Sequence, residues 1–212
     1  MSDTTTSYFS RLAAISPPEA AARYRALLSP GTPDGIAALN YMKEFEPRNA
    51  AVLFSTISPN IIDGGYRSNV IPSEATATLD VRMLPDENIE EFMALLREVI
   101  NDPQVNLSWS SNTGRPGAST PLDTEAYAVI EAVFDEFYDA PVLPVMSTGA
   151  TDMAYLRASG IQCYGIGPGI DAEDGPLGFG AHSDQERIIE SELYRFVRTN
   201  YEIVKRLAGS AQ

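Results

Sequence analysis

A regular alternation of side chains over residues 75–83 is the strongest constraint on how this chain of 212 residues can fold. Apolar and polar residues point to opposite sides there, as in a strand of a sheet that has one wet face. The apolar set is Ala75, Ala77, Leu79, Val81 and Met83. The alternation ends at Pro85 and Asp86, and apolar residues then recur at helical spacing over residues 89–100, which predicts an amphipathic helix.

The elements around this strand predict a split β-α-β unit. Helices are predicted from Ser16, as the N-cap of a capping-box pattern, and from Asp34. Residues 51–57 predict a strand, residues 59–65 a connection, and residues 105–109 a further strand. The order helix, strand, strand, helix, strand lacks the first strand of the unit, so we expect the chain to begin inside a domain.

The second half of the chain predicts an α/β layer. A stretch rich in Gly, Pro and Ser at residues 111–121 is the best candidate for a domain boundary. Beyond it, Asp123 is predicted to cap a helix, and a long helix is predicted at the C-terminus. Apolar runs predict buried strands at residues 142–146 and 161–166, separated by a helix at residues 152–158. Two such strands make half of a parallel or mixed sheet.

Three segments combine glycine with polar residues in a way that indicates a binding site. Residues 64–75 read GGYRSNVIPSEA, and the motif Asp-Val-Arg follows at residues 80–82. Residues 147–152 read STGATD. The third segment reads GIGPG at residues 165–169 and GAHSDQERI at residues 180–188. Each motif alone is weak, but three in series, with matching elements between them, are specific.

In this order and spacing the segments resemble the zinc metallopeptidase family of acetylornithine deacetylase, succinyl-diaminopimelate desuccinylase, aminoacylase, carboxypeptidase S and glutamate carboxypeptidase. The similarity runs from about residue 50 to the C-terminus. It implies a ferredoxin-like inserted lid and dimerisation domain in residues 1–111, with its sandwich at about residues 12–111 and its first strand missing. Residues 112–212 would then form half of a three-layer αβα catalytic domain. A homodimer through the lid is also implied.

The resemblance further implies a reaction and the residues that take part in it. The family uses zinc-activated water at a pair of zinc ions to cleave amide bonds of N-acyl amino acids or short peptides that carry a free carboxylate. His182, the only histidine of the chain, matches a family zinc ligand. Asn69 matches a lid residue that contacts substrate, and Gly149 and Gly167 lie on loops predicted to line the substrate pocket. Asn69 is equally explained as a turn residue, because Asn tolerates left-handed dihedrals.

Other polar residues in these segments have plainer interpretations. We expect Asp152 to cap a helix and Cys163 to be an inert core thiol. The acidic residues Asp171, Glu173 and Asp174 are expected to be solvated rather than metal-binding.

The donors for a zinc pair are incomplete in this sequence. A two-zinc site needs several nitrogen or oxygen ligands and a carboxylate as general base, and the family segments that supply them are absent. No catalytic residue is therefore predicted in this chain, and His182 is its single predicted metal ligand. Two hypotheses stand: the chain is a fragment of a metal-dependent hydrolase, or it is a catalytically inactive module for dimerisation or binding.

Charge and composition exclude several partners. The chain has 15 Lys and Arg against 29 Asp and Glu, a formal net charge of -14, which disfavours nucleic acid and anionic membranes. The N-terminus is polar and no apolar run is long enough to span a bilayer. With one cysteine, no internal disulfide forms, so we expect a cytoplasmic protein, although a longer parent chain could carry a signal peptide.

Overall fold

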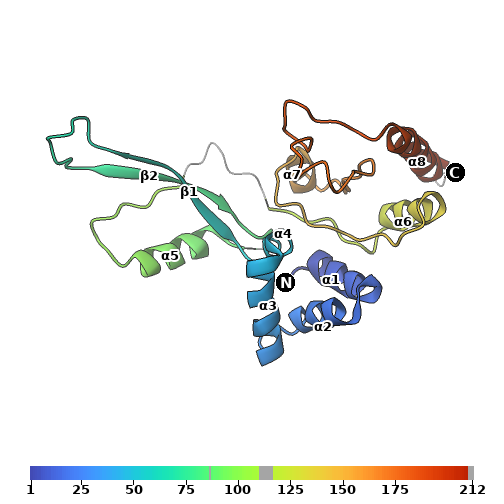
Figure 1. Cartoon of the computed structure of the whole chain (residues 1–212), viewed down its shortest axis with the longest axis horizontal. Coiled ribbons are helices and arrows are strands. Elements are labelled where there is room, and N and C mark those ends of the chain that lie inside the picture. The colour runs from blue at the N-terminus through green and yellow to red at the C-terminus, as the bar shows by residue number, and fades with distance from the viewer. Residues whose placement is uncertain (86, 110–116, 210–212) are drawn as a thin grey trace. The chain divides into compact units, whose positions relative to one another are not determined.

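The computed structural model describes residues 1–85, 87–109 and 117–209 (Figure 1). They form two compact units. The first contains Met1–Ser119 and Pro144–Ile161, and the second contains Thr120–Leu143 and Gln162–Gln212. The boundary predicted at residues 111–121 falls largely on residues 110–116, which lie outside the described residues.

The first unit begins with a helical cluster made of α1 (Asp3–Ile15), α2 (Pro18–Leu27), α3 (Pro33–Phe45) and α4 (Pro47–Ala50) (Figure 1). The hydroxyl oxygens of Ser2 and Thr32 accept hydrogen bonds from backbone N–H groups in the first turns of α1 and α3. Proline stands in the first turn of α2, α3 and α4, where its missing N–H costs no helical hydrogen bond. These start signals fix where each helix begins.

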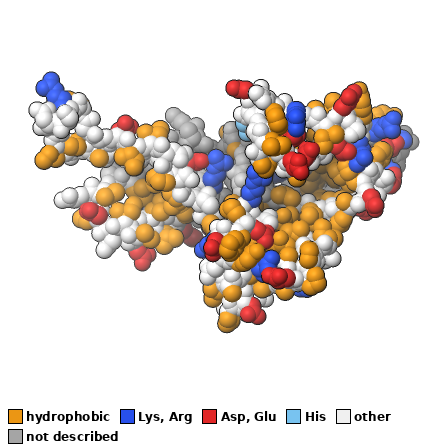
Figure 2. Space-filling model, viewed as in Figure 1, with side chains coloured by type: hydrophobic (Ala, Val, Ile, Leu, Met, Phe, Trp, Pro, Cys, Tyr) orange, Lys and Arg blue, Asp and Glu red, His pale blue; other side chains and the backbone are white. Residues whose placement is uncertain are grey.

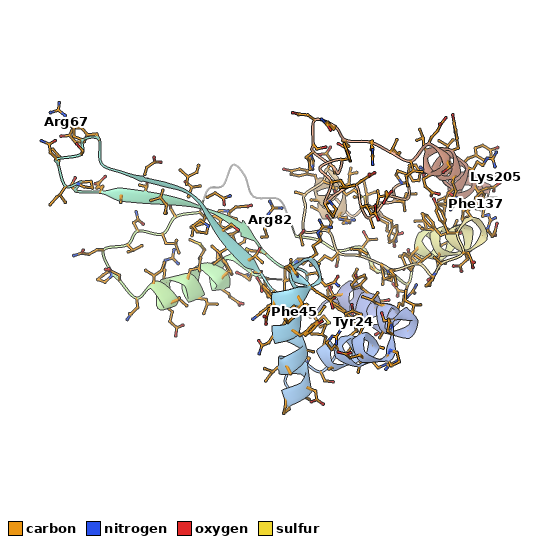
Figure 3. The ribbon with its side chains drawn as sticks, viewed as in Figure 1. Tyr24, Phe45, Arg67, Arg82, Phe137 and Lys205 are labelled. Carbon is orange, nitrogen blue, oxygen red and sulfur yellow. The ribbon has the colours of Figure 1, made fainter. Side chains whose placement is uncertain are left out.

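The helical cluster has its own apolar core. Phe9, Leu27 and Met42 are almost completely buried. The ring of Phe9 meets Tyr8 edge-on, with 5.0 Å between centroids, and lies 5.9 Å from the ring of Tyr24. Figure 3 labels Tyr24 among the side chains of these helices. Burial of this apolar surface, rather than helix propensity, holds three short helices together.

Both helices predicted for this region are formed, as α2 and α3, but their predicted caps are wrong and a further helix was missed. Helix α1 was not expected, because its polar, threonine-rich start gives a weak pattern, and packing of Phe9 and Ala13 decides it instead. Ser16 does not cap α2; its hydroxyl donates to the carbonyl of Leu12 at 2.7 Å, at the end of α1. Thr32, rather than Asp34, caps α3.

A β-hairpin follows the helical cluster. Strand β1 (Thr56–Gly64) pairs antiparallel with β2 (Ala75–Arg82), with an irregular register between Pro59 and Ile61. The start of β2 at Ala75 confirms the prediction from the alternation. Strand β1 begins later than predicted and runs through residues 59–64, where a connection was predicted. Pro59 is tolerated in it because β1 pairs on one side only in the described two-stranded sheet.

Both faces of the hairpin are exposed, which contradicts the expectation of one buried face. Every residue of β1 after Thr56 is exposed, and so are residues 75–79 of β2. Apolar side chains are spread over the hairpin and its loop in Figure 2. The third strand predicted at residues 105–109 is not formed, so the described sheet has two strands and nothing in it covers the apolar face.

Helix α5 (Ile89–Ile100) confirms the predicted amphipathic helix. The side-chain oxygen of Asn88 accepts hydrogen bonds from the N–H groups of Glu90 and Glu91, which caps its start. Asn101 ends it in a left-handed conformation with φ 46°. Of its apolar stripe, Met93 is buried.

Helices α6 (Glu125–Phe137) and α8 (Glu190–Gly209) pack together in the second unit (Figure 1). Their core contains Ile130, Val133 and Ile203. Arg206 of α8 donates two hydrogen bonds to the carboxylate of Glu136 of α6, at 2.8 and 2.7 Å. Both helices were predicted from their apolar spacing, but much of the expected α8 stripe is exposed, namely Leu193, Val197, Tyr201 and Val204.

The predicted α/β layer is not formed as expected in the second half of the chain. Residues 142–146 and 161–166 are not strands, whereas α7 (Met153–Ala158) confirms the helix between them. Thr124 caps α6 in place of Asp123. The structure is thus a mixture of helices and a small antiparallel sheet. None of the helices in the described ranges is both long and apolar enough to cross a bilayer.

Candidate functional site

Asn69 lies in the loop that joins β1 to β2 and is exposed there. Gly65 opens this loop with φ 79°, a left-handed conformation that favours glycine. Figure 3 labels Arg67 in this loop, at the far end of the hairpin from Arg82. Asn69 is therefore an exposed residue of a hairpin loop, and its contact with substrate stays a prediction.

Arg82 ties the base of the hairpin to the segment at residues 147–152. Its Nη1 donates to the carbonyl oxygen of Thr148 at 2.8 Å. Its Nε and Nη2 donate to Asp80 at 3.1 and 3.0 Å, so the guanidinium is held from both sides. The sequence motif Asp-Val-Arg does not itself predict a role for Arg82. The structure shows that this arginine positions the loop that carries Gly149.

Gly149 sits in a turn whose shape comes from Ser147. The N–H of Gly149 donates to the Ser147 hydroxyl at 3.1 Å. A Cβ added at Gly149 would lie 3.4 Å from that hydroxyl, and one added at Gly167 would meet no atom within 4 Å. Packing within the described residues therefore does not require glycine at Gly167, and its predicted role, room for a ligand beside the backbone, stays a prediction.

Asp152 stands at the N-cap position of α7, as expected, but its side chain makes no capping hydrogen bond. The helix is short and none of its residues is buried.

His182 is exposed and has a left-handed backbone, with φ 69°. Its N–H donates to a carboxylate oxygen of Glu186 at 3.2 Å. Tight turns surround it, since Ser183 N–H donates to the carbonyl of Gly180 and Glu186 N–H to the carbonyl of Ser183. A non-glycine residue with positive φ is uncommon and strained, so these contacts hold His182 in a conformation it would not adopt by itself.

The glycine-rich loop before His182 is held by Asp174 and Arg187. Asp174 is 8% exposed, and Arg187 donates to its Oδ1 from Nε at 2.9 Å and from Nη2 at 2.5 Å. The guanidinium lies over the ring of Phe179, 4.0 Å from the centroid. Hydrogen bonding to Asp174 raises the pKa of Arg187. The expectation that Asp174 is solvated is therefore wrong, and no local sequence signal could have revealed its burial, because its partner lies 13 positions later in the chain.

The predicted site residues are divided between the two units. Asn69 and Gly149 belong to the first, and Gly167 and His182 to the second. Cys163, in the second unit, is half-buried; its N–H donates to the hydroxyl of Thr120 at 3.1 Å.

The donors in the described residues do not fit a zinc site. No three His, Cys, Asp or Glu side chains come together there in a way that could hold a metal ion. The carboxylate of Glu186, four residues after His182, accepts a hydrogen bond from the backbone N–H of His182. A structural or catalytic zinc needs at least three protein ligands, so His182 by itself cannot hold one.

Comparison with known proteins gives consistent matches. A family model described as a peptidase dimerisation domain matches residues 13–107. The chain is 32% identical over 120 residues to the N-fatty-acyl-amino acid synthase/hydrolase of Xenopus tropicalis, which covers 56% of this chain and 23% of that protein. It is 29% identical over 108 residues to the probable carboxypeptidase S-like 2 of Dictyostelium discoideum, covering 50% and 21%. It is 25% identical over 150 residues to aminoacylase-1A of Rattus norvegicus, covering 70% and 36%. No solved structure matches the chain.

These matches confirm the resemblance that the motifs indicated: the chain is similar to peptidases of the M20 family, and residues 13–107 match the peptidase dimerisation domain of that family. The family consists of peptidases and amidohydrolases, and is thus a family of hydrolases. The alignments span only 21% to 36% of the length of these three relatives.

Proposed function

We propose that the chain is part of a metal-dependent hydrolase that cleaves the amide bond of N-acyl amino acids or of short peptides with a free carboxylate. The observation that carries this proposal is the joint similarity to an N-fatty-acyl-amino acid synthase/hydrolase, a carboxypeptidase S-like protein and an aminoacylase. The substrates in these names share an amide beside a carboxylate. Residues 1–111 are proposed as the lid and dimerisation domain, and residues 112–212 as part of the catalytic domain.

The residues of this chain have distinct proposed roles in that hydrolase. Asn69, at the tip of the hairpin, contacts the bound substrate. Gly149 and Gly167 let the substrate approach the backbone. Arg82 is a positioning residue, because it holds the carbonyl of Thr148 beside Gly149. The left-handed turn at His182 presents an exposed imidazole, which would be one ligand among donors supplied from outside this chain.

The alternative is a catalytically inactive module that forms a homodimer. Two observations favour it: the match to a peptidase dimerisation domain, and the lack of a metal-binding cluster in the described ranges of the chain. The exposed apolar side chains of the hairpin, such as Ile62 and Ile71, would be covered in such a dimer. A ferredoxin-like lid would need the hairpin to gain strands that the described residues do not form.

Metal content and turnover, measured together on the purified chain, test the proposal. Zinc is quantified by mass spectrometry, and hydrolysis is assayed with N-acyl amino acids and dipeptides. If the chain is part of a larger hydrolase, we expect little tightly held zinc and no turnover by the chain alone. Turnover should then appear when the remaining domain of an M20 relative is fused before Met1. Failure of every folded fusion to hydrolyse these substrates would favour the inactive module.

The oligomeric state is measured in the same preparations by light scattering. A homodimer that is lost when Ile62 and Ile71 are both changed to Ser would support the dimerisation role. A stable, monodisperse monomer would contradict it.

A further inference from the structure

The first unit contains a cavity of about 460 Å³ between the helical cluster and residues 145–148. This volume lies within the range of about 300 to 1,000 Å³ that is typical of small-molecule sites. Three stretches of chain line it, and all of them belong to the first unit. The lining residues are Thr5, Tyr8, Pro47, Arg48, Asn49, Ala51, Val52, Val145, Met146 and Thr148.

The polar groups of the wall are already engaged with one another. The hydroxyl of Tyr8 donates to Asn49 Oδ1 at 3.0 Å, and Asn49 Nδ2 donates to Glu46 Oε2 at 2.8 Å. The same Glu46 oxygen accepts a hydrogen bond from Tyr24 at 2.9 Å. The hydroxyl of Thr5 is 2.9 Å from that of Ser2. Because these groups satisfy each other, what the wall offers a ligand is chiefly hydrocarbon surface.

Arg48 is the exception in this lining. It is exposed, and no residue in the described ranges forms a hydrogen bond or an ion pair with it. A guanidinium binds a carboxylate through two parallel hydrogen bonds. An apolar cavity with an unpaired arginine at its wall suits a ligand that has an aliphatic chain and an acidic head.

The cavity also reaches the segment that carries Gly149. Thr148 lines it, and the carbonyl of Thr148 is the group that Arg82 holds. Val145 and Met146 lead directly into that segment, and Met146 packs against the core of the helical cluster. A ligand in the cavity would therefore touch the loop assigned above to substrate binding.

We propose that this cavity binds the aliphatic chain of an N-acyl amino acid, with the carboxylate of the ligand on Arg48. The proposal rests on the proposed function for the substrate class, and it adds that the helical cluster selects long acyl chains over short ones. Transfer of the ligand's aliphatic acyl chain from water into the cavity supplies most of the binding affinity. The charge-assisted hydrogen bonds of Arg48 supply the preference for an acid over a neutral amide.

Binding to the intact chain is the test, since it needs neither metal nor turnover. N-lauroylglycine is titrated calorimetrically below its micelle concentration, beside N-acetylglycine and the neutral N-lauroylglycinamide. We expect one molecule of N-lauroylglycine per chain, at least about tenfold weaker binding of the amide, and no measurable binding of N-acetylglycine. Free laurate distinguishes a general fatty-acid site from one that also recognises the amide.

Two variants and a matched control make the result specific. Arg48→Gln should weaken N-lauroylglycine binding by about tenfold or more, whereas Arg25→Gln, the same change at an exposed arginine of α2 outside the cavity, should leave it unchanged. Val145→Trp adds a large ring to the wall at a residue that is 65% exposed, so it should block binding without disturbing the core. Circular dichroism checks that each variant is folded.

The outcomes separate this inference from the proposed function. No binding of N-lauroylglycine to the wild-type chain, or equal effects of Arg48→Gln and Arg25→Gln, would overturn the cavity assignment even if a fusion hydrolyses N-acyl amino acids. Specific binding that depends on Arg48, without hydrolysis by any fusion, would support the assignment of the cavity as a ligand site. It would contradict only the proposed hydrolase function.

Discussion

Phe9 is the residue whose removal should most weaken the helical cluster. It is 0% exposed, and its ring packs on both Tyr8 and Tyr24. Truncation of a buried Phe to Ala costs about 3 to 5 kcal/mol, from lost burial and from the cavity that remains. Alanine returns about 0.5 kcal/mol through its better helix propensity. We therefore expect Phe9→Ala to lower the local free energy of unfolding by about 3 kcal/mol or more.

Phe45→Ala is the matched control, because it deletes the same ring from the same cluster. Phe45 is 59% exposed and contacts chiefly the ring of Tyr41, 4.7 Å away between centroids (Figure 3). Its removal leaves no buried cavity, so the cost should stay below about 1 kcal/mol.

Native-state hydrogen exchange with mass spectrometry measures both variants in the helical cluster alone. A difference of about 3 kcal/mol corresponds to roughly a hundredfold difference in protection of peptides from α1–α3. Equal loss of protection in the two variants would show that the cluster is not held by the core described here. Phe9→Leu, which keeps most of the volume, should cost less than about 1.5 kcal/mol and guards against complete unfolding.

Three further predictions concern single side chains. Burial and the hydrogen bond to Glu46 raise the pKa of Tyr24 from 10.0 to about 12, so the folded state holds this proton more tightly than the unfolded chain. The stability that the protonated Tyr24 hydroxyl contributes is complete below pH 10 and is lost as the pH rises toward 12. Tyr24→Phe should therefore reduce the fall of the urea denaturation midpoint between these pH values. Arg187→Ala leaves the buried carboxylate of Asp174 without its ion pair, so proteases should cut the glycine-rich loop faster. An unchanged cleavage rate would show that the pair of Asp174 and Arg187 does not hold this loop. Asn101→Ala should lower the free energy of unfolding, measured by urea denaturation, by about 1 kcal/mol, because Ala tolerates the left-handed conformation poorly. Asn101→Gly should not lower it, because Gly adopts this conformation without strain.

The sequence by itself determined the elements whose signals are local. The alternation from Ala75 predicted β2, and helical spacing predicted α5, α6 and α8. Both signals are local, because apolar residues recur every second position in a strand and every three to four positions in an amphipathic helix. The left-handed stop at Asn101 has a local signature of the same kind. The motifs around Asn69, Gly149 and His182 also indicated the family to which the comparisons point.

Tertiary structure decided what depends on partners distant in the chain. Helix α1 is stabilised because Phe9 and Ala13 pack in one core with residues of α2 and α3. The threonine-rich sequence of α1 does not predict this packing. The buried pair of Asp174 and Arg187, and the bond from Arg82 to Thr148, join residues 13 and 66 positions apart. The apolar runs at residues 142–146 and 161–166 predicted strands that did not form, because a strand needs a neighbour for its backbone hydrogen bonds and these runs have none in the described structure. Local pattern fixes the period of an element, whereas the contacts that bury it are properties of the whole fold.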